Sequence, residues 1–166
     1  MAISQITNAS LGTNQLVSAN MPTGSVLQVV QGTVAYDTTT TSTSYSSSGL
    51  FATITPKYAT SKILVTCTSN SVYQATAGEG LRNRIYRGTS GEGSGSSVAA
   101  QSYILQTNAA SLYATGSITF LDAPATTSAI TYTMMNATAT AGRTVGWNYG
   151  FGTGNLGTMI LMEIAA

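Results

Sequence analysis

The residues that could carry acid–base chemistry are few, and histidine is absent from the sequence. Without histidine the chain lacks the commonest general base, the commonest metal ligand and the usual partner of a nucleophilic serine. A glycoside hydrolase needs only two carboxylates about 5–10 Å apart, so a small glycan hydrolase stays open as an alternative. The sequence favours a protein that is not an enzyme and holds no cofactor or metal. The five carboxylates are far apart along the chain: Asp37, Glu79, Glu92, Asp122 and Glu163.

The one cysteine, Cys67, cannot form an intrachain disulfide. Residues 62–68 have the pattern of a strand in which Cys67 shares a face with Ile63 and Val65. No histidine is available to activate the thiol. We therefore predict that Cys67 is a small buried hydrophobic residue and not a nucleophile.

Residues 145–152 carry the only tryptophan, interleaved with glycines. Trp147, Asn148 and Tyr149 could bind a sugar by stacking on its apolar face and bonding its hydroxyl groups. The alternation of Trp147, Tyr149 and Phe151 favours a different interpretation, in which these side chains point one way and fill a core or an interface. Receptor contact and packing both stay open for this segment.

A second candidate receptor surface contains Arg82, Arg84 and Tyr86, which would share one face of a strand. Tyrosine and arginine are typical of binding hot spots. A solvated strand face is the more common outcome, and Glu79 and Glu92 balance the charge on either side. The net charge of +1 and the scattered basic residues offer no patch for nucleic acid.

The composition predicts an all-β protein. Charged residues make up 7% of the chain, against roughly 25% in an average soluble domain. Threonine, the β-branched aliphatic residues and tyrosine fit a pleated strand, whereas the scarce lysine and glutamate favour helices. A surface of hydroxyl groups also has little electrostatic repulsion, which suits permanent assembly. A composition inherited from a biased genome is the alternative.

From Gly24 onward, short apolar runs alternate with turn-rich segments, as in a sandwich or barrel. We predict that residues 24–166 form an antiparallel, jelly-roll-like β-sandwich. The last strand is apolar on both faces, so we expect both to be buried, in the sandwich or against another subunit. The expected strands cover residues 25–34, 49–55, 62–69, 80–87, 97–106, 111–121, 129–136, 144–151 and 157–164.

Residues 1–23 are expected to form a short extended segment for docking and oligomerisation. A spacing of five residues fits neither the helical period of 3.6 nor the strand period of 2. It would suit an extended segment that lies against sister chains or a partner, although a disordered tail stays open. The start of the chain lacks the pattern of a signal peptide, and no run is long enough to span a membrane. The aliphatic residues with this spacing are Ile6, Leu11, Leu16 and Met21.

Several motifs resemble a domain common in tail-fibre and other virion proteins of marine and cyanobacterial phages. The N-terminal spacing is also similar to the lead-in that often precedes this domain. The motifs, in order, are GSVLQVVQ at 24–31, ITP at 54–56, SKILV at 61–65, FLDAPATT at 120–127 with Tyr132 following, and LMEIA at 161–165.

The resemblance implies a trimeric β-sandwich without catalysis on a virion. The short N-terminal segment fits a short fibre or an appendage of the capsid or tail better than a long fibre. The partners would be sister chains and other virion proteins, and the globular part could contact a glycan of the host surface. A carbohydrate-binding receptor-recognition module is the alternative function.

Overall fold

The structure is a computed structural model that describes residues 21–101, 108–150 and 156–166. The described residues form ten strands and no helix, as the composition predicts. Within the same ranges, no helix has the length and apolar character needed to cross a membrane. The strands are β1 (Val26–Val34), β2 (Thr38–Thr40), β3 (Ser46–Ile54), β4 (Lys62–Gln74), β5 (Leu81–Gly88), β6 (Ser96–Gln101), β7 (Leu112–Asp122), β8 (Ile130–Thr138), β9 (Val145–Trp147) and β10 (Gly157–Ile164).

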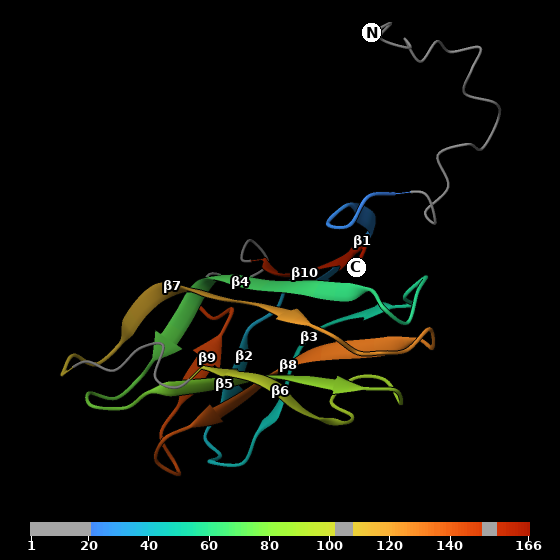
Figure 1. Ribbon diagram of the computed structural model, residues 1–166. Coiled ribbons are helices and arrows are strands. Elements are labelled where there is room, and N and C mark those ends of the chain that lie inside the picture. The colour runs from blue at the N-terminus through green and yellow to red at the C-terminus, as the bar shows by residue number, and fades with distance from the viewer. Residues whose placement is uncertain (1–20, 102–107, 151–155) are drawn as a thin grey trace, which may run out of the picture.

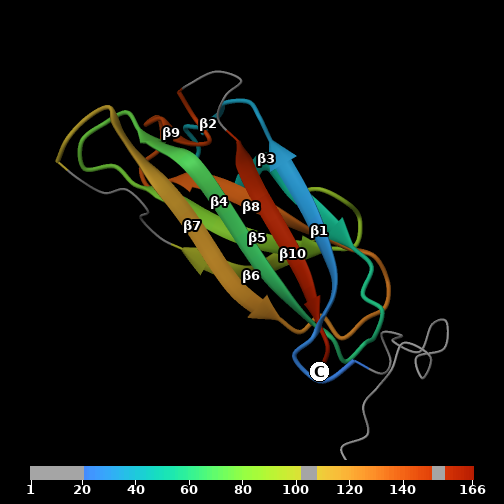
Figure 2. The same ribbon diagram turned by 90° about the horizontal axis from the view of Figure 1, so that it is seen from above.

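The strands form two antiparallel sheets packed face to face (Figure 1). The six-stranded sheet has the order β1-β10-β4-β9-β2, with β7 also paired to β4. The four-stranded sheet has the order β3-β8-β5-β6. Figure 2 shows β7, β4, β10 and β1 side by side over the second sheet. The predicted all-β sandwich is confirmed.

The strand pairs are nested in sequence, which explains the topology. β1 pairs with β10, β3 with β8, β4 with β7, and β5 with β6. Successive nested pairs alternate between the six-stranded and the four-stranded sheet. A long antiparallel hairpin that rolls up on itself gives this order, which is that of a jelly roll. The short strands β2 and β9 add a pair at one end of the six-stranded sheet.

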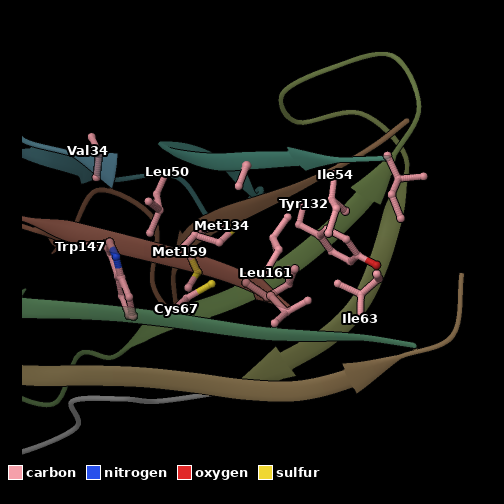
Figure 3. Packing of buried hydrophobic residues seen from close by; sticks show 14 of the residues in the cluster. Val34, Leu50, Ile54, Ile63, Cys67, Tyr132, Met134, Trp147, Met159 and Leu161 are labelled. Atoms are coloured by element: carbon pink, nitrogen blue, oxygen red, sulfur yellow. The ribbon is translucent and has the colours of Figure 1, made fainter. Parts of the chain in front are cut away.

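The core lies between the sheets and is made by alternate residues of facing strands (Figure 3). β4 contributes Ile63 and Cys67, and β8 contributes Tyr132 and Met134. The face shared by Cys67, Ile63 and Val65 was predicted from the period-2 pattern, and all three side chains are buried. Complete burial of an aliphatic side chain contributes about 1.5–3 kcal/mol, so these alternating residues account for much of the stability of the sandwich.

Several strand boundaries differ from the sequence-based expectation. The strand β2 was not expected, and β3 begins at Ser46, before the expected start at residue 49. β4 continues to Gln74 because a bulge between Ser69 and Val72 allows it to stay paired with β7. β9 ends at Trp147, well before residue 151, because Asn148 has a φ of +62° and interrupts the extended backbone. Residues 102–106 and 151, which were also expected in strands, lie outside the described ranges.

β10 was expected to be buried on both faces, and in the single chain only one face is buried. Met159 and Leu161 point into the core, whereas Ile160 and Met162 are half-buried on the outer side of the six-stranded sheet. β8 is buried along its whole length, as is the short strand β9. The loop after β5 lies against the outer face of β8, where the Gly93 N–H donates to Thr133 Oγ1 at 2.9 Å.

Candidate interaction surfaces

Of the four aliphatic residues predicted for docking and oligomerisation, Met21 is described and Ile6, Leu11 and Leu16 lie outside the described ranges. The chain joins the sandwich beside the end of β10. The Gly24 N–H donates to the Ala165 carbonyl oxygen at 2.8 Å, and the Ala165 N–H donates to the Ser25 carbonyl oxygen at 2.9 Å. Gly24 and Ser25 therefore lie beside the end of the C-terminal strand.

Trp147 and Asn148 were candidates for receptor contact, and the structure places both in the interior with no exposed surface. Trp147 is among the largest fully buried side chains of the core. The Asn148 Nδ2 donates to the carbonyl oxygens of Val34 and Tyr36, both at 3.2 Å. Asn148 therefore ties the end of β1 to the segment after β9. Burial argues against a receptor contact for Trp147 and Asn148.

The alternation of aromatic residues had suggested that Tyr149 points the same way as Trp147. In the structure the two side chains point in different directions. The positive φ of Asn148 turns the chain, and the Tyr149 ring stacks on Tyr73 with 4.4 Å between ring centroids. The ring centroid of Tyr113 lies 4.9 Å from that of Tyr73, on the same outer side of the sheet. Gly146 makes room, because a Cβ atom there would lie 3.0 Å from the Tyr149 Cβ. Receptor contact by Tyr149 stays a prediction.

Arg82, Arg84 and Tyr86 share the outer face of β5, as their spacing predicts. Each is half-buried, and both arginines have partners within the chain. The Arg82 Nη2 donates to the Thr138 carbonyl oxygen at 2.6 Å. The Arg84 guanidinium lies 4.2 Å from the ring centroid of Tyr45. These contacts hold the arginine side chains in place, and receptor binding by this face stays a prediction.

Glu79 is a fully buried carboxylate that sequence reasoning had treated as part of a balanced surface. Its Oε1 accepts hydrogen bonds from the N–H groups of Gly80, Ala139 and Thr140 at 2.7–3.1 Å. The Thr138 hydroxyl adds a fourth donor at 2.9 Å. Burial alone would raise the pKa of Glu79, but these hydrogen bonds outweigh it and lower the pKa below its ordinary value of 4.5. Glu79 thus joins the β4–β5 and β8–β9 connections.

Glu163 is also fully buried and holds segments together. It accepts hydrogen bonds from the N–H of Lys57 at 2.7 Å and from Gln28 Nε2 at 2.6 Å. Burial would raise the pKa of Glu163, yet the hydrogen bonds lower it overall. The carboxylate thereby fastens β1 and the β3–β4 connection to the end of β10.

Asp122 connects the two sheets. Arg87 Nη1 donates to both carboxylate oxygens of Asp122, at 2.8 and 2.6 Å, and the Tyr132 hydroxyl donates to Oδ2 at 2.6 Å. Glu163 and Asp122 lie in one cross-strand row with the buried Ile63 between them. This row is the nearest approach to a carboxylate pair in the register of the sheets, and both carboxylates serve as structural acceptors.

The two exposed carboxylates also have structural partners. Asp37 accepts a hydrogen bond from the Gly150 N–H at 3.1 Å, and Glu92 accepts one from the Ser47 hydroxyl. Among the described residues, no three acidic, cysteine or histidine side chains gather into a group that could hold a metal ion. Each of the five acidic side chains therefore accepts at least one hydrogen bond within the chain.

Cys67 is expected to be unreactive in the folded protein. It is fully buried, and burial raises the pKa of its thiol to about 12, so the thiolate is scarce at neutral pH. A thiol reagent such as a disulfide dye should label native protein far more slowly than protein unfolded in guanidinium. Rapid labelling of native protein would show that this part of the core opens readily.

The outer side of the six-stranded sheet presents a surface that is poor in ionised groups. We call it the open face. Among the described residues of β1, β10, β4 and β7, the charged residue on this side is Lys62, which lies at the rim of the face. Three rows of side chains cross β1, β10, β4 and β7. They are Thr33, Thr158, Thr68 and Ser117; then Gln31, Ile160, Thr66 and Thr119; then Val29, Met162, Leu64 and Leu121.

No protein-family model matches the chain, and neither does any curated protein.

Proposed function

We propose that this chain is a non-catalytic structural subunit of a phage-type virion, a short fibre or an appendage of the capsid or tail. In this proposal it assembles as a homotrimer and docks through residues 1–23. The open face carries the proposal, because four adjacent strands present almost entirely uncharged polar and apolar side chains, with Lys62 at the rim. Such a surface suits permanent contact with other subunits.

The roles of the carboxylates support the non-catalytic part of the proposal. A general acid or base needs an ionisable group that can exchange its proton with a substrate. Glu79 and Glu163 are fully buried, and their hydrogen bonds hold them as carboxylates with a lowered pKa. Asp122 already accepts from Arg87 and Tyr132. These groups stabilise the sandwich, which is what a structural subunit requires.

The rival function, a carbohydrate-binding receptor module, loses part of its support. Trp147 and Asn148 were the residues best suited to stack on a sugar and bond its hydroxyl groups, and both are buried. Tyr149 remains near the surface, stacked on Tyr73. Contact with a host glycan is therefore a secondary property that the structural proposal does not need.

The proposal predicts a trimer in solution. Sedimentation of the full chain should give three times 17.0 kDa, about 51 kDa. Serine in place of Ile6, Leu11 and Leu16 together should leave the sandwich folded and prevent incorporation into virions, because the apolar docking contacts are lost. Monomeric protein at all concentrations would contradict the assembly claim. Normal incorporation of the triple variant would contradict the docking claim.

A further inference from the structure

One row of the open face is apolar across four strands. Val29, Met162, Leu64 and Leu121 lie directly opposite one another in the register of β1, β10, β4 and β7. Val29 is 57% exposed and Leu121 is 53% exposed, so these side chains are largely in contact with water. The rows toward the other end of the face consist mainly of threonine, serine and glutamine, whereas Ile164 and Lys62 follow on the side of the pocket. Apolar side chains gathered in this way mark interaction sites more often than scattered ones do.

A pocket adjoins this apolar row at the end of the face where the chain enters the sandwich. Its volume is about 390 Å³, and its walls are largely apolar. It lies where β1 begins and β10 ends. Figure 2 shows these two strand ends next to each other, with the end of the chain labelled C. Residues lining it include Thr23, Gly24, Lys62, Leu121, Ile164 and Ala165. The row and the pocket share Leu121, and together they form one continuous apolar surface.

We infer that this apolar row and pocket are where a second copy of the chain packs in the trimer. The inference rests on the proposed function and names the surface that assembly would use. The scarcity of ionised groups on this surface restricts its partner. A protein with ionised groups facing it would bury them without opposite charges, and burying unpaired charges is unfavourable. A second copy of this chain largely avoids that cost, because 7% of its residues are charged, and Lys62 lies at the rim of the face, where its ammonium group can stay in water.

The test is sedimentation of the full-length chain with a charge on exposed members of the row. We expect Leu121→Asp, and separately Val29→Asp, to raise the dissociation constant of the trimer by about 100-fold or more, because each interface would bury an unpaired carboxylate. Both side chains are more than half exposed in the single chain, so the fold should survive. Unchanged thermal unfolding of the diluted, dissociated protein checks this point.

Ser117→Asp is the matched control, because it adds the same charge to the same face of β7 at the hydroxyl-rich end. This variant should stay trimeric. A trimeric parent whose Leu121→Asp and Val29→Asp variants also stay trimeric would overturn the inference and leave the proposed function standing. Equal dissociation by Ser117→Asp would overturn the assignment to the apolar row.

A parent chain that is monomeric throughout would overturn both the proposed assembly and the inference. If, in that monomer, Leu121→Asp increased proteolysis before Met21, the occupant of the surface would be the chain's own N-terminal segment. The three results are therefore distinguishable by sedimentation and limited proteolysis.

Discussion

Replacing Glu79 with alanine is expected to lower the free energy of unfolding by about 3–5 kcal/mol, because it leaves several buried donors unsatisfied. The Glu79 Oε1 accepts from three backbone N–H groups and one threonine hydroxyl, and the side chain is fully buried. Its ion pair with Arg143, at 3.8 Å, contributes little because that guanidinium is 43% exposed. Urea denaturation followed by circular dichroism measures the effect.

Glu92→Ala is the control for Glu79→Ala. Glu92 is exposed and accepts one hydrogen bond from Ser47, so its removal should change stability by about 0.5 kcal/mol or less. Glu79→Gln should be intermediate, because the amide oxygen can still accept some of the hydrogen bonds but lacks the charge. Equal stability of Glu79→Ala and Glu92→Ala would show that the buried hydrogen bonds of Glu79 contribute no net stability.

Acid should destabilise the fold by protonating the Glu79 carboxylate. The folded-state pKa of Glu79 lies below its ordinary value of 4.5, so the carboxylate stabilises the fold at pH values above 4.5. This contribution is lost as the pH falls through the lowered, folded-state pKa. Glu163 behaves in the same way, with the same direction of shift. Glu79→Gln should therefore lose less stability than the parent between pH 7 and strongly acidic pH.

The sandwich could be predicted from the sequence because its strands carry the period-2 signal locally. Cys67 with Ile63 and Val65 in β4 is one example, and all three side chains are buried as expected. The apolar pattern of β10 had predicted burial of both faces. Ile160 and Met162 are as apolar as their inward-facing neighbours, yet they lie half-buried on the open face. Apolar character alone does not separate a core contact from a contact with another subunit.

The role of Glu79 could not be predicted, because its partners are remote in the sequence. A glutamate shortly before three arginines resembles an ordinary charged surface, whereas its donors Ala139 and Thr140 come sixty residues later. The predicted direction of the Tyr149 side chain was wrong for a local reason. Asn148 adopts a positive φ, which asparagine tolerates better than most residues, and the turn separates Tyr149 from Trp147. The period-2 pattern cannot anticipate such a turn.

Trp147→Ala is expected to destabilise the domain by about 3–5 kcal/mol, because it empties a large space in the core. Trp147 is fully buried, and β9 holds it between β2 and β4. The packing is close, since a Cβ atom added at Gly116 would lie 2.9 Å from the Trp147 ring and 2.5 Å from a methyl of Val72. The surrounding strands therefore cannot collapse easily into the space.

The effect should appear in stability and not in a selective loss of ligand binding. Thermal unfolding of Trp147→Ala and of Phe51→Ala gives the comparison, because Phe51 is an aromatic residue that is 41% exposed and its loss leaves no internal cavity. The tryptophan fluorescence of the parent should also resist quenching by iodide until the protein unfolds. A Trp147→Ala variant as stable as Phe51→Ala, together with ready quenching of the native parent, would place the indole at the surface and restore it as a candidate for receptor contact.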